Sequence, residues 1–131
     1  EIYQNQSEYE FNLRVYHVNN PEVISDRDQM LRVLNNLVTN AIQAIPEGRR
    51  GKIDVAVREY KNRIFIRVND NGVGISEEGK EKIFVPNFTT KSTGTGLGLA
   101  MVKNIVSSSG GNVFFWSKEG KGASFYIELI R

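Results

Sequence analysis

The chain has 131 residues and a formal net charge of +2 at pH 7, and 40% of its residues are hydrophobic while 24% are charged. This composition is typical of a single globular domain, and the small net charge argues against nucleic acid as a partner. The absence of cysteine excludes a disulfide scaffold and a thiolate metal site, and no apolar run in the sequence is long enough to cross a membrane.

The first part of the chain predicts a strand followed by a long helix. Residues Glu8–Val18 alternate in polarity, which predicts a half-buried strand with an apolar face made of Phe11, Leu13 and Val15. The only histidine, His17, continues that face, and we expect it to be a structural residue. Ser25 can cap a helix that runs to about Ile45 and stops at the Pro-Glu-Gly sequence after it.

The rest of the chain predicts two hairpins and two further helices. In order, we expect a hairpin of Gly51–Tyr60 and Arg63–Asn69, a short helix at Ser76–Ile83, a loop at Phe84–Thr95, a helix at Leu97–Ser109, and a hairpin of Asn112–Ser117 and Gly122–Ile130. The order β-α-β-β-α-α-β-β predicts a two-layer α/β (α+β) sandwich, in which helices cover one face of a mixed, mainly antiparallel sheet.

Two asparagines in the long helix suggest a ligand site. Asn36 and Asn40 are one helical turn apart, so their side chains share a face. Amide oxygens are neutral, hard ligands, and they suit a Mg²⁺ ion that is held largely by substrate phosphates. The pair could instead be the polar stripe of an amphipathic helix. However, the helix is nearly apolar around the pair, where amides need partners, and this favours the ligand interpretation.

Three glycine-rich clusters follow, at residues 70–75, 94–99 and 120–124. Asp70 opens the first cluster, and its carboxylate can accept a hydrogen bond from an exocyclic amine such as that of adenine, although Asp-Asn-Gly is also common in turns. The second cluster, GTGLGL, directly precedes a helix, so its backbone N–H groups can form an anion site. Lys91 lies in the loop before it, where an ammonium can neutralise phosphate charge or simply be solvated.

Taken in order, these motifs resemble the ATP-binding catalytic domain of bacterial sensor histidine kinases, in the gyrase, chaperone, histidine kinase and mismatch-repair ATPase superfamily. The resemblance covers nearly the whole chain, from about residue 8 to residue 129. It rests on five motifs, which are NLVTNA (36–41), DNGVGI (70–75), IFVPNFTTK (83–91), GTGLGL (94–99) and GKGASF (120–125). The resemblance implies the sandwich fold of that domain, called the Bergerat-type or histidine-kinase ATPase fold.

The resemblance also implies ATP and Mg²⁺ as ligands. Asn36 and Asn40 would hold Mg²⁺ and the phosphates, Lys91 would assist catalysis, and Asp70 would bind the adenine amine. Ser124 would stand where the family usually has a threonine near the base. The other implied nucleotide-binding residues are Gly72, Gly74, Ile75, Phe84, Thr89, Thr90, Gly94, Thr95, Gly96, Leu97, Gly98 and Leu99. We expect residues 87–95 to form a lid that is mobile without nucleotide, and Phe84 and Phe88 to anchor its base in the core.

One position separates branches of this superfamily. The water-activating members carry a glutamate general base four residues before the second asparagine of the helix. That position is Asn36 here, and an amide cannot take a proton from water near neutral pH. We therefore expect the domain to hold ATP without hydrolysing it efficiently, and to transfer the γ-phosphoryl group to a histidine elsewhere. The alternatives are a Ser/Thr-directed kinase of the anti-sigma-factor type and a non-catalytic nucleotide-binding interaction module.

The resemblance finally implies partners. The acceptor histidine would lie on a separate dimerisation and phosphoacceptor domain of the same kinase, which would act indirectly on a response regulator in two-component signalling. We expect residues 1–131 to be one cytoplasmic ATP-binding domain excised from a longer kinase, whose parent can be anchored in the inner membrane. The isolated domain should be a monomer, and the full-length protein a homodimer.

Overall fold

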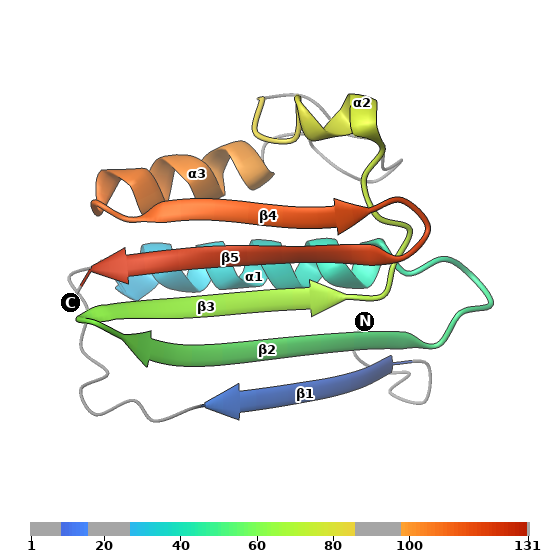
Figure 1. Ribbon diagram of the computed structural model, residues 1–131, viewed down its shortest axis with the longest axis horizontal. Helices are drawn as coiled ribbons and strands as arrows, with labels where there is room; N and C mark the ends of the chain where they lie inside the picture. Colours follow the sequence, from blue (N-terminus) through green and yellow to red (C-terminus); the bar gives the residue numbers. More distant parts are fainter. Residues whose placement is uncertain (1–8, 16–26, 86–97, 131) are drawn as a thin grey trace.

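The computed structural model describes residues 9–15, 27–85 and 98–130. These residues form a five-stranded sheet in the order β1-β2-β3-β5-β4, and α1 runs along the strands behind β3 and β5 (Figure 1). The elements are β1 (Tyr9–Val15), α1 (Arg27–Gln43), β2 (Gly51–Tyr60), β3 (Arg63–Asp70), α2 (Glu77–Lys80), α3 (Gly98–Ser108), β4 (Asn112–Lys118) and β5 (Gly122–Ile130). Strand β1 is parallel to β2 and the other pairs are antiparallel, so the predicted mixed, mainly antiparallel sandwich is confirmed.

The element boundaries follow from local chemistry. Lys61 and Asn62 both adopt positive φ, as a two-residue hairpin turn between β2 and β3 requires. Ser76 caps α2, because its hydroxyl accepts a hydrogen bond from the Gly79 N–H at 2.9 Å. Both α1 and α2 end before the positions expected from the sequence, at Gln43 and Lys80. The expected cap Ser25 and the histidine His17 lie outside the described residues.

The core lies between the helices and one face of the sheet. Helix α1 packs on β2 and β3, α3 packs on β4, and the two helices pack on each other. The apolar stripe of α1 recurs every fourth residue, which places one face of the helix against the sheet. The largest fully buried side chains come from both layers and are Leu37, Ile53, Ile127, Val33, Val68, Val102 and Val106.

The apolar face of β1 differs from the sequence prediction. Phe11, Leu13 and Val15 pair with alternate residues of β2, so they share the face that carries the core. They are nevertheless 44%, 71% and 63% exposed. Strand β1 is at the edge of the sheet, beyond the strands on which α1 packs (Figure 1). The prediction of a half-buried strand, with this apolar face buried, is therefore wrong.

The opposite face of the sheet also carries exposed aromatic side chains. Phe114 and Trp116 of β4 are 51% and 59% exposed. They alternate with Val113 and Phe115, which point towards the helices. Within the described part of the chain, no helix is both long enough and apolar enough to span a membrane.

Candidate functional site

The first glycine cluster, residues Asp70–Ile75, forms a turn after β3. We call it the base turn, because the sequence predicts that Asp70 contacts the nucleotide base. Asp70 is only 6% exposed, and its Oδ1 accepts a hydrogen bond from the Gly72 N–H at 2.8 Å. Gly72 lies directly on the end of α1, where a β-carbon would be 2.5 Å from the Ala44 carbonyl oxygen. The next N–H, of Val73, donates to that same oxygen at 2.9 Å. Only glycine fits at position 72, and the base turn is fastened to α1 there.

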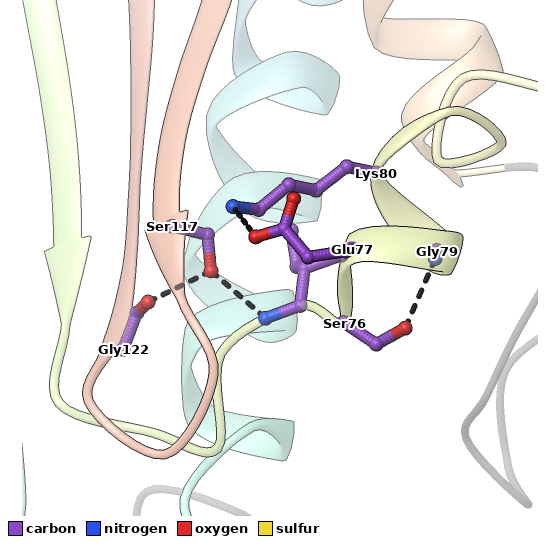
Figure 2. A network of polar contacts seen from close by, with 7 residues as sticks. Ser76, Glu77, Gly79, Lys80, Ser117 and Gly122 are labelled. Carbon is purple, nitrogen blue, oxygen red and sulfur yellow. Dashed lines mark hydrogen bonds and ion pairs between the residues drawn. The ribbon is translucent and has the colours of Figure 1, made fainter.

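The turn between β4 and β5 holds the other side of the base turn. Gly74 has φ +73°, and a β-carbon there would be 2.4 Å from the Lys118 carbonyl oxygen. The Gly120 N–H donates to the Val73 carbonyl oxygen at 2.7 Å. The Ile75 N–H donates to the Ser117 hydroxyl at 2.8 Å, and Figure 2 shows this serine beside Gly122. Ser117 was not predictable from the sequence, because no local pattern reveals a contact 42 residues away.

Arg49 is a second site residue that the sequence did not reveal. Its Nη1 donates to the carbonyl oxygens of Asn71 and Gly72 at 2.8 and 3.0 Å. The Asn71 side chain accepts from the Lys52 N–H at 2.7 Å and donates to the Arg50 carbonyl oxygen at 3.1 Å. The loop after α1 therefore holds the base turn at its exposed side.

Asn36, the first of the two asparagines of α1, lies at the beginning of α3. Asn36 Nδ2 donates to the Arg32 carbonyl oxygen at 2.9 Å. A β-carbon on Gly98, the first residue of α3, would be 2.6 Å from Asn36 Oδ1, so that oxygen lies against the helix start. Asn40, one turn further along α1, is half-buried. Two segments that are 62 residues apart in sequence are thus brought together.

The donor set fits a magnesium ion that shares its coordination with phosphates. The described residues contain no group of three or more His, Cys, Asp or Glu side chains that could hold a metal alone. Asn36 and Asn40 offer amide oxygens on one face of α1, and Asn36 lies beside the N-terminus of α3. Mg²⁺ keeps several waters and is bound through few protein ligands plus substrate phosphates. This chemistry fits the residues that are present.

Ser124 does not lie on the side of Asp70. In the pairing of β3 with β5, Asp70 faces Ala123, while Ser124 faces Asn69. Successive side chains of a strand point to opposite faces, so Ser124 lies on the face away from the helices. There its hydroxyl donates to Asn69 Oδ1. Ser124 therefore does not lie on the side of Asp70, the expected base-binding residue, and Ala123 occupies that side instead.

The remaining predicted residues divide into two groups. Phe84 packs edge-on against Phe115 with ring centroids 5.9 Å apart, and Lys103 Nζ is 5.1 Å from the centroid of the Phe84 ring. These contacts agree with its expected role as an anchor, and Leu99 likewise packs against the core. The following predicted residues lie outside the described ranges: Thr89, Thr90, Lys91, Gly94, Thr95, Gly96 and Leu97, together with Phe88 and the whole lid at 87–95.

Comparison with known proteins identifies the family of the chain. Residues 25–131 match the family described as histidine kinase-, DNA gyrase B-, and HSP90-like ATPase. The sensor histidine kinase ZraS of Escherichia coli is 50% identical over 109 residues, which cover 83% of this chain and 23% of ZraS. WalK of Bacillus subtilis, also a sensor histidine kinase, is 36% identical over 110 residues, covering 79% of this chain and 18% of WalK.

A solved structure gives the same result for the fold. The nucleotide-free catalytic domain of histidine kinase ThkA superposes with a TM-score of 0.79 at 34% identity, covering 98% of this chain and 87% of that one. The chain therefore belongs to the family of histidine kinase-, DNA gyrase B- and HSP90-like ATPase domains. It spans less than a quarter of the length of ZraS, a sensor histidine kinase that it resembles.

Proposed function

We propose that this chain binds Mg²⁺-ATP and transfers the γ-phosphoryl group to a histidine on a separate dimerisation domain of the same kinase. One observation carries the proposal. Asn36 and Asn40 share one face of α1, and Ala44, four residues after Asn40, follows the last residue of the helix and still donates its N–H to the Asn40 carbonyl oxygen. Gly98 lies against Asn36, and Gly72 lies against Ala44. At a rise of about 1.5 Å per residue these contacts are about 12 Å apart, a separation that a nucleoside triphosphate can span.

The base end of this arrangement favours adenine. A carboxylate has two oxygens and accepts several hydrogen bonds, so Asp70 can accept from the exocyclic amine of adenine while Gly72 holds its Oδ1. Guanine has a carbonyl oxygen at the corresponding position, which would face the carboxylate as one acceptor against another. Burial of Asp70 strengthens this discrimination, because water cannot easily replace the missing donor.

The phosphate end accounts for transfer rather than hydrolysis. We assign Mg²⁺ to Asn36 and Asn40, and the phosphates to the N–H groups at the start of α3, where the helix dipole favours negative charge. Neither amide can act as a general base towards water. A histidine supplied by another domain would then be the nucleophile, and the response regulator would receive the phosphoryl group from it. Because ATP is an intracellular substrate, we assign this reaction to the cytoplasm.

Transfer in a two-component mixture tests the proposal. The purified chain is incubated with γ-labelled ATP and Mg²⁺, with and without the dimerisation domain of its parent kinase, and a dimerisation domain lacking the acceptor histidine is the control. We expect acid-labile, alkali-stable label on the dimerisation domain only when its histidine is present. The chain alone should neither become labelled, on His17 or elsewhere, nor release appreciable phosphate.

The same mixture separates the alternatives. Acid-stable label on serine or threonine would indicate a kinase of the anti-sigma-factor type. Tight ATP binding without transfer to any acceptor would indicate a non-catalytic nucleotide-binding module. Label on His17 would contradict the assignment of the acceptor histidine to a separate domain. Phosphate release at about 1 s⁻¹, the lower end of ordinary enzyme rates, would contradict the assignment of Asn36 as a residue that cannot activate water.

A further inference from the structure

Ser117 is a buried polar residue at the base end of the site. It is 4% exposed, and its hydroxyl makes two hydrogen bonds. It accepts from the Ile75 N–H at 2.8 Å and donates to the Gly122 carbonyl oxygen at 2.9 Å. Figure 2 shows the Ser117 hydroxyl with both bonds as dashed lines, between the end of β4 and the segment that leads into α2. The single donor of this hydroxyl and one of its two acceptor lone pairs are therefore used.

The sheet register places Ser117 in the same row as Asp70. Asp70 pairs with Ala123 across β3 and β5, and Ala123 pairs with Ser117 across β5 and β4. Paired residues point to the same face of a sheet, so Asp70 and Ser117 lie on one face with the small side chain of Ala123 between them. Strand spacing puts the backbones of Asp70 and Ser117 about 10 Å apart.

Through its two hydrogen bonds, Ser117 connects both ends of the base turn. Ile75, the last residue of that turn, is bound directly. Gly122 lies against Asp70, the first residue of the turn, because a β-carbon on Gly122 would be 2.1 Å from the Asp70 carbonyl oxygen. The other contacts between the β4–β5 turn and the base turn, at Gly74 and Gly120, involve main-chain atoms. Among these contacts, the Ser117 hydroxyl is the one that a side-chain substitution removes.

We propose that Ser117 is a positioning residue for adenine recognition: its hydroxyl fixes Ile75 and Gly122, and thereby sets where the Asp70 carboxylate lies relative to the base. This inference rests on the proposed binding of ATP. Without the hydroxyl, the Ile75 N–H loses its buried acceptor and the base turn is no longer fixed at its far end. Because the lost hydrogen bonds lie at the end of the site that binds the base, the affinities for ATP and ADP should fall equally, and the phosphate contacts should stay intact.

The test compares Ser117→Ala and Ser117→Thr with Ser109→Ala as a matched control. The Ser109 hydroxyl also donates to a backbone carbonyl, that of Val106 at 2.9 Å, but it lies at the end of α3. Calorimetry gives the affinities for ATP, ADP and GTP, and thermal melting without nucleotide gives the stability. We expect Ser117→Ala to weaken ATP and ADP binding about tenfold each and to reduce the preference for ATP over GTP. Ser117→Thr should restore both, and Ser109→Ala should change neither.

Two outcomes would overturn the proposal. The first is a Ser117→Ala protein that melts at a lower temperature but keeps wild-type affinities and the wild-type ATP/GTP ratio, since this would make Ser117 a purely stabilising residue. The second outcome is measured by amide hydrogen exchange on the wild-type chain without nucleotide, so it does not depend on whether a variant folds. The Ile75 amide should exchange with solvent slowly, and rapid exchange would mean that its bond to Ser117 does not form. Failure of the wild-type chain to bind ATP would instead reject the proposed function itself.

Discussion

Gly98 and Asn36 lie in direct contact, and only the absence of a side chain at position 98 permits it. A β-carbon on Gly98 would be 2.6 Å from Asn36 Oδ1, well inside the van der Waals contact distance. The atom that it would displace is the amide oxygen that we assign to Mg²⁺. The contact therefore couples the start of α3 to the proposed metal ligand, and it makes position 98 a sensitive probe of that ligand.

Gly98→Ala should impair phosphoryl transfer without destabilising the fold. Alanine is a better helix former than glycine, and among the described residues its β-carbon would closely contact only the end of the Asn36 side chain, which can move away. We expect a thermal midpoint equal to or above the wild type, but transfer to the acceptor domain reduced at least tenfold, as for Asn40→Ala. Ser107→Ala, on the exposed face of the same helix, is the control. Wild-type transfer by Gly98→Ala would show that Asn36 does not position the metal.

Asp70→Asn should change nucleotide selectivity while it preserves the base turn. The amide oxygen can still accept from the Gly72 N–H, whereas the other terminal atom changes from an acceptor to a donor. The lost contact with the adenine amine should cost about 1–3 kcal/mol, or roughly tenfold to a hundredfold in ATP affinity. The affinity for GTP should rise, because the new donor matches its carbonyl. Calorimetry with both nucleotides measures this, and an unchanged ATP/GTP ratio would reject Asp70 as the base-recognition residue.

Arg49→Ala should loosen the base turn from its exposed side. The substitution removes two hydrogen bonds to the carbonyl oxygens of Asn71 and Gly72. Because the arginine is exposed, water can replace part of the loss, and we expect a cost of about 1 kcal/mol in the free energy of unfolding. ATP affinity should fall severalfold. The neighbouring Arg50→Ala is the matched control, since Arg50 contributes its carbonyl oxygen and not its side chain. Equal effects of the two substitutions would show that the specific contacts of Arg49 are unimportant.

The elements of the fold were predictable because their signals are local. Alternation of apolar residues in β2 and β3, with Lys61-Asn62 between them, is enough to indicate a hairpin. Gly110 and Gly111 likewise end α3, where their N–H groups donate to the Ser107 and Val106 carbonyl oxygens. The contacts that complete the site are not local. Arg49, Ser117 and the pairing of Gly98 with Asn36 depend on how distant segments pack, which no spacing in the sequence encodes.

The two differences from expectation have a common physical cause. A strand pattern shows which residues share a face, but not what covers that face or which partner each residue meets. The position of Ser124 relative to Asp70 depends on the register between β3 and β5. A shift of that register by one residue moves the side chain to the other face of the sheet. The three apolar residues of β1 do share one face of the sheet, as predicted. However, that part of the face extends beyond the strands on which α1 packs.

The exposure of the β1 face gives a direct test of stability. Leu13 is 71% exposed, whereas Leu37 of α1 is 1% exposed, so the same substitution should have different costs at the two positions. Leu37→Ala removes buried methyl groups and leaves a cavity, which should cost about 2–5 kcal/mol. Leu13→Ala should cost about 0.5 kcal/mol or less, as for other surface substitutions. Urea denaturation of both variants under identical conditions measures the two values. A cost for Leu13→Ala close to that of Leu37→Ala would mean that the apolar face of β1 is covered in solution.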